Sequence, residues 1–267
     1  MLPLNSIICG DNCEVLKTFG FQSIDLVVTS PPYDSLRVYG GHSWNFEELA
    51  QQLWRVIKPG GVVVWVVNDA TVDGSETGTS FRQALQFMEI GFKLHDTMIY
   101  KKTGIQFPET NRYYPNFEFM FVLSKGQPKS VHLIVDRDNK TVGESIHGKE
   151  RMPDGSLEKR SGSRKGSVVK DFGVRWNVWE YGTGLGKSAE ESIAFKHPAI
   201  FPEDLAGDHI RSWSNEGDIV LDPFNGSGTT TKMARELGRR YIGIDINEEY
   251  CAIARKRLSQ QLLSFMG

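Results

Sequence analysis

Cysteine is scarce in this 267-residue chain, and its three copies form no paired motif. Cys9, Cys13 and Cys251 lack C-x-x-C spacing, which argues against a disulfide framework and against a zinc site. The six histidines form no metal-ligand cluster either, so no metal ion is expected. A secretory signal and any run of 18 apolar residues are also missing, so we expect a cytoplasmic protein without a membrane partner.

The chain has almost no excess of either charge, with 31 Lys and Arg against 33 Asp and Glu. The charge is unevenly distributed, however, because residues 137–187 hold 11 basic and 7 acidic side chains. Residues 159–175 hold six basic side chains and one acidic one in a Gly- and Ser-rich stretch. Such a stretch suits either a mobile arm that closes on phosphates or a solvated linker. The candidate phosphate contacts are Lys159, Arg160, Arg164, Lys165, Lys170 and Arg175.

A glycine-containing loop, Asp222–Gly228, follows the apolar run Ile219–Leu221 and precedes a helical segment that starts at Thr229. Gly226 and Gly228 allow a tight turn and a close approach to a ligand. The next apolar run ends in Asp245, 23 residues after Asp222, close to the roughly 20 expected for an acid that binds a ribose in a βαβ unit. Neither G-x-G-x-x-G nor G-x-x-x-x-G-K-S/T is present, so neither a dinucleotide nor phosphate cradling is favoured. The pattern indicates an adenosine-containing cofactor without a pyrophosphate, the alternative being a simple turn.

A second motif, Ser30-Pro31-Pro32-Tyr33, follows the apolar run Ile24–Thr29. Two consecutive prolines fix the backbone and lack N–H donors, so they form a rigid ledge with free carbonyl oxygens. A ledge with an acceptor carbonyl, a hydroxyl and an aromatic ring suits an amino group on a stacked planar ring. The alternative is a strand-terminating turn with a buried tyrosine. Both motifs follow buried strands, where open α/β sheets bind their ligands, so they predict two halves of one pocket.

Together the motifs resemble the amino-methylating DNA methyltransferases, which use S-adenosylmethionine to modify cytosine N4 or adenine N6. Ser30–Tyr33 matches the family's catalytic D/N/S-P-P-Y/F/W motif, and Phe224–Gly228 matches its F-x-G-x-G motif. The catalytic motif comes first and the cofactor loop lies near the C-terminus, as in the permuted group called β. This resemblance extends to G-D, K-P-G-G, K-H-P and G-x-D…R-L segments, here at Gly10–Asn12, Arg55–Val64, Lys196–Ala199 and Tyr241–Leu258.

The resemblance implies S-adenosyl-L-methionine as the cofactor and duplex DNA as the partner. It implies a cofactor site built from Asp11, Thr29, His197, Pro198, Asp222, Pro223, Phe224, Gly226, Ser227, Gly228, Thr229, Asp245 and Ile246. The implied catalytic residues are Ser30, Pro31, Pro32 and Tyr33. The amine would donate hydrogen bonds to the Ser30 hydroxyl and the Pro31 carbonyl, while Tyr33 would stack on a base flipped out of the duplex.

The choice of base is only partly indicated. Ser30 favours cytosine N4, because most adenine N6 enzymes of the family carry Asp at that position. Methylation of cytosine C5 is disfavoured because it needs a cysteine nucleophile, usually after proline, and the cysteines here follow Ile8, Asn12 and Tyr250. Adenine N6 methylation by the same mechanism, an RNA methyltransferase, and an inactive DNA-binding protein remain as alternatives. A homodimer and a cognate restriction endonuclease are open partners, and a prokaryotic or phage-encoded, nucleoid-associated protein is expected.

The sequence predicts an α/β, Rossmann-like methyltransferase fold with a mostly parallel seven-stranded sheet and an inserted target-recognition region. Residues 1–125 are expected to form the catalytic half, 126–190 the target-recognition region, and 191–267 the cofactor-binding half of the same domain. Strands are predicted at Ile24–Thr29, Val62–Val67 and Phe117–Leu123, and helices at Phe46–Ile57 and Ser80–Ile90.

Two acidic residues near these motifs depart from the family's pattern. Glu118 stands where many relatives carry an H-E pair, and without its histidine neighbour it receives no catalytic role here. Asp34, directly after Tyr33, is interpreted as a surface acid. Trp176 and Trp179 are expected in the core rather than facing DNA.

Overall fold

The computed structural model describes residues 2–32, 44–104, 111–146, 149–159, 167–184 and 186–264. The chain forms two compact units, the first built from residues 1–132 together with 177–267 and the second from residues 133–176. Within the described residues, no helix combines the length and the apolar character needed to cross a membrane.

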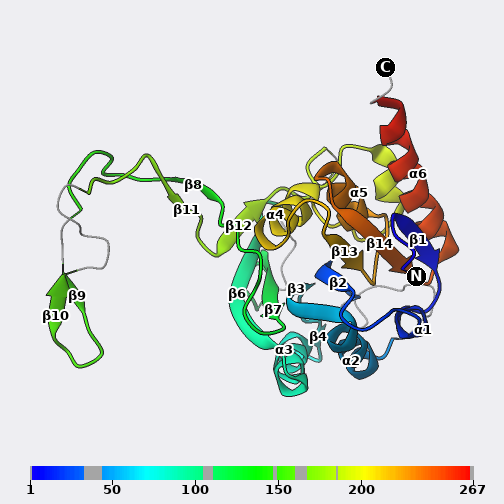
Figure 1. The fold of residues 1–267 in the computed structure, drawn as a ribbon, viewed down its shortest axis with the longest axis horizontal. Coiled ribbons are helices and arrows are strands. Elements are labelled where there is room, and N and C mark those ends of the chain that lie inside the picture. Colours follow the sequence, from blue (N-terminus) through cyan, green and yellow to red (C-terminus); the bar gives the residue numbers. More distant parts are fainter. Residues whose placement is uncertain are drawn as a thin grey trace. The chain divides into compact units, whose positions relative to one another are not determined.

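The first unit is built on one eight-stranded sheet with the order β1-β14-β13-β2-β3-β7-β6-β12 (Figure 1). Only β7 runs antiparallel to its neighbours, β3 and β6; all other pairings are parallel. The central strands are nearly continuous apolar runs, as expected when helices cover both faces of a sheet. The strands are β1 (Ser6–Cys9), β2 (Ile24–Thr29), β3 (Ile57–Val67), β6 (Lys93–Lys102), β7 (Phe117–Ser124), β12 (Val178–Tyr181), β13 (Ile219–Asp222) and β14 (Arg240–Asp245).

Helices of the described residues cover both faces of this sheet (Figure 1). One layer holds α1 (Asn12–Lys17), α2 (Phe46–Val56) and α3 (Thr79–Ile90), and the other holds α4 (Glu203–Trp213), α5 (Thr229–Glu236) and α6 (Glu248–Ser264). Helix α2 illustrates why these segments are helical. Asn45 caps its start by accepting a hydrogen bond from the Glu48 N–H at 3.2 Å, and Leu49 and Leu53 on its inner face are fully buried. A short 3₁₀ helix, η1 (Ser192–Lys196), leads into α4.

The expected Rossmann-like α/β architecture is confirmed, with one strand more than predicted. The eighth strand, β12, joins the sheet edge by parallel pairing with β6, with Trp179 opposite Tyr100. Its four residues are too short and too mixed in character to stand out from the sequence around them. Strand β3 begins at Ile57, five residues before the predicted start, because Ile57 is already extended and a register shift carries the pairing past Gly60.

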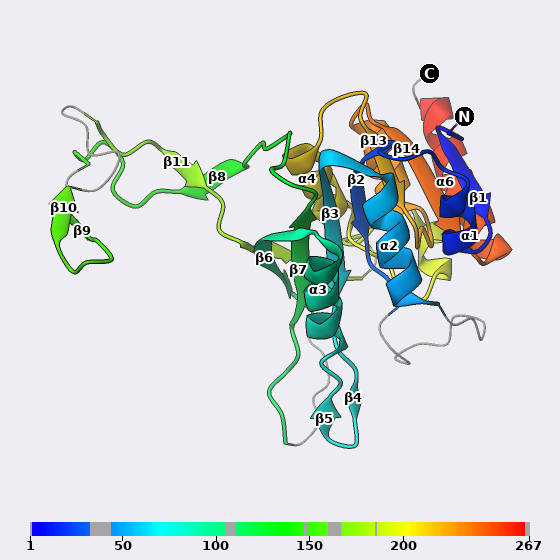
Figure 2. The same cartoon turned by 60° about the horizontal axis from the view of Figure 1, so that its bottom comes forward.

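A small hairpin, β4 (Thr71–Val72) and β5 (Ser75–Glu76), projects from the carboxyl edge of the sheet in Figure 2. It follows β3 and precedes α3, which Asp69 caps by accepting hydrogen bonds from the Ser80 N–H at 2.8 Å and the Ser80 hydroxyl at 2.6 Å. The hairpin and residues 111–115 both lie beside the cavity described below.

The second unit consists of antiparallel two-stranded segments. Strand β8 (Val135–Asp138) pairs with β11 (Phe172–Val174), and β9 (Lys149–Arg151) pairs with β10 (Leu157–Lys159). Trp176 is 66% exposed and its ring contacts the Arg137 guanidinium at 4.5 Å, so the expectation that it lies in the core is wrong. Trp179 is buried in the first unit, as expected. The two residues differ because Trp179 lies on a sheet strand whereas Trp176 lies outside it.

Candidate functional site

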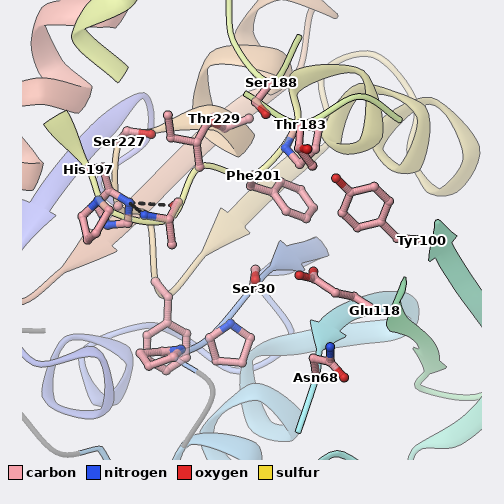
Figure 3. A pocket seen from close by; sticks show the side chains of 18 of the residues that line it. Ser30, Asn68, Tyr100, Glu118, Thr183, Ser188, His197, Phe201, Ser227 and Thr229 are labelled. Carbon is pink, nitrogen blue, oxygen red and sulfur yellow. Dashed lines mark hydrogen bonds between the residues drawn. The ribbon is translucent and has the colours of Figure 1, made fainter. Parts of the chain in front are cut away.

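The two sequence motifs meet at one cavity of about 1330 Å³ at the carboxyl edge of the sheet (Figure 3). The ledge after β2 contributes Ser30, Pro31 and Pro32 to the cavity wall. The remaining predicted residues that line the cavity are Asp11, His197, Pro198, Asp222, Pro223, Phe224, Gly226, Ser227, Thr229, Asp245 and Ile246. The strands β2, β13 and β14 are adjacent and parallel, so their carboxyl ends bring these segments together.

The glycine loop turns tightly because both of its glycines have left-handed backbone angles. The φ values are 48° at Gly226 and 84° at Gly228. A Cβ at Gly228 would lie 2.8 Å from the Cβ of Ala254 on α6, and a Cβ at Gly226 would lie 3.0 Å from Nε2 of His197. Any larger residue would therefore displace neighbouring parts of the site as well as strain the backbone.

Asp222 lies at the end of β13 with its carboxylate buried beneath the loop. Its Oδ1 accepts hydrogen bonds from the Thr29 hydroxyl at 2.7 Å and from the Phe224 N–H at 3.0 Å. Burial raises the pKa of Asp222 to about 6 despite these donors. Thr29 is fully buried behind the cavity wall, so it positions Asp222 and does not line the cavity itself.

Asp245 ends β14 and anchors the glycine loop from the other side. Its two carboxylate oxygens accept hydrogen bonds from the Gly226 N–H at 2.8 Å and the Asn247 N–H at 2.9 Å. His197 packs edge-on against Tyr250 with ring centroids 4.3 Å apart, and its Nδ1 lies 2.7 Å from the Ala199 carbonyl oxygen. His197 is therefore held in place by packing and backbone contacts beside the loop.

A buried network of charges supports the glycine loop from below. The Arg257 guanidinium donates to the Ser227 carbonyl at 2.7 Å and also pairs with Glu203. Lys232, only 1% exposed, lies 2.9 Å from both Glu203 and Glu191. The neighbouring cations hold the pKa of Glu191 below its usual range even though burial opposes this. Because Glu203, Lys232 and Arg257 come from α4, α5 and α6 and Glu191 directly precedes η1, the network ties these elements to the loop.

Opposite the loop, the cavity wall near Ser30 carries Tyr100, Lys102 and Glu118. Figure 3 shows the Glu118 carboxylate directed toward Ser30. Glu118 received no role from the sequence, yet it is 8% exposed, lines the cavity and pairs with Lys102 at 2.5 Å. The sequence around Glu118 did not reveal this position, because only the register of β6 and β7 brings Glu118 and Lys102 together.

Several further residues of the cavity were missed by sequence reasoning. Asn12 donates from Nδ2 to the Pro223 carbonyl at 3.2 Å. Asn225 packs where Gly243 leaves room, since a Cβ at Gly243 would lie 2.5 Å from its side chain. Trp44 packs against Phe224 with ring centroids 4.9 Å apart. Asn12 directly follows a predicted site residue, and Asn225 stands between two of them. Their closeness in sequence to those residues could therefore have identified them.

The remaining predicted site residues do not line the cavity or lie outside the described residues. Gly228 caps the start of α5. Tyr33, Asp34, Arg160, Arg164 and Lys165 lie outside the described residues. In the second unit, Lys159 and Lys170 are exposed. The Arg175 Nε–H, by contrast, donates to both carboxylate oxygens of Asp136, at 3.1 Å to Oδ1 and 3.0 Å to Oδ2. That guanidinium holds the pKa of Asp136 below its usual range, so much of the Arg175 charge is compensated within the chain.

Comparisons with known proteins agree with this geometry. The DNA methylase family N6_N4_Mtase matches residues 24–256. The orphan methyltransferase M.BamHII of Bacillus amyloliquefaciens is 57% identical over 249 residues, covering 92% of this chain and 93% of that protein. Type II methyltransferase M.SmaI of Serratia marcescens is 28% identical over 295 residues, covering 94% and 90%.

Two solved structures share the fold. PvuII DNA methyltransferase (cytosine-N4-specific) superposes with a TM-score of 0.67 at 21% identity, covering 94% of this chain and 85% of that one. A putative DNA modification methylase from Thermus thermophilus, complexed with S-adenosyl-L-methionine, has a TM-score of 0.62 at 24% identity, covering 96% and 95%. With the family match over most of the chain, these findings show that the protein belongs to the N6/N4 DNA methylase family and is a DNA methyltransferase.

Proposed function

We propose that this enzyme transfers a methyl group from S-adenosyl-L-methionine to the N4 amine of a cytosine flipped out of duplex DNA. The observation that carries the proposal is that the Ser30-Pro31-Pro32 ledge and the glycine loop line the same cavity. Ser30 favours cytosine over adenine, and the PvuII neighbour is named as cytosine-N4-specific. Methylation of adenine N6 by the same residues is the alternative.

The residues around the glycine loop fit S-adenosyl-L-methionine. Asp245 ends β14, where an acid can accept from ribose hydroxyls, and Asp222 offers a carboxylate to a cationic group. Asp11 stands where the family's acid contacts adenine. The amide nitrogen of Asn225 is buried without a hydrogen-bond partner among the described residues, which leaves a donor for a ligand in the same loop.

The mechanism requires the chain to position an amine and to keep its lone pair available. The bound cofactor supplies an electrophilic methyl group on a sulfonium. Ser30 and the Pro31 carbonyl accept hydrogen bonds from the target amine, which draws its nitrogen toward tetrahedral geometry. The nitrogen then forms the new bond to the methyl carbon as the sulfur–carbon bond breaks, and the proton that the amine loses passes to water. No covalent enzyme intermediate is needed.

The second unit is the proposed DNA-recognition element. It lies within the predicted target-recognition region, 126–190, and exposes Lys159 and Lys170. We assign these two, together with Arg160, Arg164 and Lys165, to phosphate contacts. A phosphate contact is less favoured for Arg175, because Asp136 already pairs with its guanidinium. A homodimer and a cognate endonuclease stay predictions of the sequence, and the 57% identical relative is named an orphan methyltransferase.

The proposal is tested by mass spectrometry of nucleosides from plasmid DNA prepared in an unmethylated host and incubated with protein and S-adenosyl-L-methionine. N4-methylcytosine is the expected product. N6-methyladenine would keep the cofactor and mechanism and reverse the choice of base. Neither product, with cofactor binding intact in titration calorimetry, would contradict the proposal and turn attention to RNA.

Replacing Asp245 by Ala should weaken cofactor binding by about 1.5–3 kcal/mol, the range for losing a charged hydrogen bond. The same change removes the acceptor of the Gly226 N–H, so the glycine loop loses an anchor as well. Titration calorimetry gives the dissociation constant directly. The matched control is Asp154→Ala, an acid of the second unit whose carboxylate accepts from Ser156. An unchanged constant in the Asp245 variant would remove this residue from the site.

Cofactor affinity should rise as the pH increases from about 5 to 7, because the cationic cofactor favours ionised Asp222, whose pKa is about 6. Stability without cofactor should run the other way. A folded-state pKa above the ordinary value of 3.8 means that the unfolded state gives up its proton first, so this group lowers stability as the pH rises from about 4 to 6. Both trends should disappear in Asp222→Asn, as measured by calorimetry and thermal unfolding across that pH range. Trends that persist in the variant would assign them to other groups.

A further inference from the structure

The wall of the cavity beyond Ser30 carries three polar side chains on one face of the sheet. Tyr100 on β6 lies directly opposite Glu118 on β7 in the antiparallel register, and Lys102 is two residues further along β6. Residues opposite each other, and residues two apart in a strand, point to the same face. Across the sheet order β2-β3-β7-β6, Ser30 after β2 comes first, Glu118 on β7 comes next, and the two side chains of β6 lie furthest from Ser30.

These three groups offer one acceptor and two donors. Lys102 and Glu118 pair at 2.5 Å with side chains only 14% and 11% exposed. An ammonium has three hydrogens and a carboxylate has several lone pairs, so both keep capacity for a ligand after pairing. The Tyr100 hydroxyl is buried and has no hydrogen-bond partner among the described residues. Burial and the nearby Glu118 charge raise the pKa of Tyr100, so at neutral pH this hydroxyl keeps its proton and acts as a donor.

An unpartnered buried donor is costly unless a ligand satisfies it. Tyr100 lines the same cavity as Ser30, and Figure 3 shows both labelled side chains on the walls of that cavity. Adjacent strands of a sheet lie about 4.8 Å apart, so Glu118 and the groups of β6 are spaced on the scale of one pyrimidine edge. The wall is therefore suited to a planar ring that presents a donor near Ser30 and acceptors further away.

We propose that Glu118, Lys102 and Tyr100 read the Watson–Crick edge of the flipped base, and that their pattern matches cytosine. Glu118 and the Ser30 hydroxyl share one hydrogen of the N4 amine and the Pro31 carbonyl accepts the other, while Lys102 donates to the ring nitrogen N3 and Tyr100 donates to the carbonyl oxygen O2. This inference rests on the proposed function and deepens it, since it assigns the choice of base to named side chains.

The pattern discriminates against adenine and thymine by leaving hydrogen-bonding groups of the wall unsatisfied. Adenine presents the amine and one ring acceptor, but it has no carbonyl to receive the second donor. Thymine presents a carbonyl and an N–H in the places of the amine and N3, so it would oppose Glu118 with an acceptor and Lys102 with a donor. A site built to hydrogen-bond a substrate group rejects analogues without it strongly, because its own buried groups are left unpaired.

The test uses methylation kinetics of the full-length enzyme on a duplex oligonucleotide whose target is first mapped in methylated plasmid. Tyr100→Phe should lower kcat/KM for DNA about tenfold, and Lys102→Met about a hundredfold, with an unchanged cofactor dissociation constant. The double variant Lys102→Met/Glu118→Gln removes both charges together, so it keeps the test valid if the single change leaves Glu118 unpaired and unfolds the protein. The unchanged cofactor constant reports that the fold is intact.

Two neighbours serve as matched controls that do not line the cavity in the described chain. Lys101 pairs with Glu180 at 2.6 Å, and both side chains are about half exposed. Lys101→Met therefore removes a Lys–Glu pair next to Lys102 that lies at the surface and outside the cavity lining. The Tyr181 hydroxyl donates to Asp208 at 2.7 Å, and its ring lies 6.1 Å from that of Tyr100, so Tyr181→Phe tests a neighbouring tyrosine. Because neither side chain lines the cavity, both controls should keep kcat/KM within about twofold of the wild-type value.

The outcomes separate this inference from the proposed function. Losses confined to the wall variants, with N4-methylcytosine as the wild-type product, would support the inference. Full activity in the wall variants would overturn it and leave the proposed function standing. A wild-type product of N6-methyladenine would overturn the match to cytosine. Cofactor binding without any DNA methylation by the wild type would overturn the proposed function itself, and the inference with it.

Discussion

Arg257→Met should destabilise the protein by about 3–5 kcal/mol, the cost of removing one partner from a buried ion pair. Arg257 is fully buried, and its loss would leave Glu203 with Lys232 as its remaining cation in the network described above. It would also leave the Ser227 carbonyl without its 2.7 Å donor. We therefore expect a large drop in the unfolding midpoint, measured by urea denaturation, together with weaker cofactor binding in the fraction that folds.

Arg255→Met is the matched control, because Arg255 lies on the same helix but forms an exposed pair with Glu248 at 2.8 Å. Exposed pairs contribute little, so this variant should unfold close to the wild-type midpoint. Equal midpoints for the Arg255 and Arg257 variants would mean that the buried network adds nothing to stability. A destabilised Arg257 variant with unchanged cofactor affinity would separate the network from the glycine loop.

Ser30→Ala should lower kcat by about 10²–10³-fold while leaving the cofactor dissociation constant within about twofold. Ser30 lines the cavity on the ledge after β2, whereas the glycine loop follows β13. Its hydroxyl is assigned to the amine that reacts, so its loss affects the chemical step more than binding. Single-turnover methylation of the mapped oligonucleotide measures the step, and calorimetry measures the cofactor.

The Asp245→Ala variant should give the opposite result, since we assign that residue to the cofactor side of the cavity. Ser30→Ala should therefore act on turnover and Asp245→Ala on the dissociation constant. If Ser30→Ala instead weakened the cofactor and left the rate of the chemical step intact, Ser30 would belong to the cofactor side of the cavity. The proposed hydrogen bond from the target amine would then have no support.

Local patterns predicted the parts of the fold that depend on neighbouring residues. The apolar runs predicted β2 and β13 with little error, because buried parallel strands need continuous apolar sequence. The loop Asp222–Gly228 was identifiable from its glycines, since they adopt backbone angles that other residues avoid. Because both motifs directly follow buried parallel strands, whose carboxyl ends lie at one edge of the sheet, the sequence also predicted that Ser30 and Gly226 line one cavity.

What depends on distant pairing was not predictable in this way. Glu118 and Lys102 are 16 residues apart, and only the register of two antiparallel strands makes them partners. Glu203, Lys232 and Arg257 come from three different helices, and each charged residue alone suggests an exposed side chain. Their burial follows from how the helices pack, which no short window of sequence contains.

The second unit leaves and rejoins the rest of the chain through paired strands. Val135 stands opposite Val174, and the Arg175 N–H donates to the Ile134 carbonyl at 2.9 Å, so the entry and the exit of this segment lie side by side. A segment with adjacent ends can be lengthened, shortened or exchanged while the chain on either side keeps its path. On the proposal that the second unit recognises DNA, a new target sequence could arise from replacement of this segment alone, while the residues that carry out methyl transfer stay unchanged.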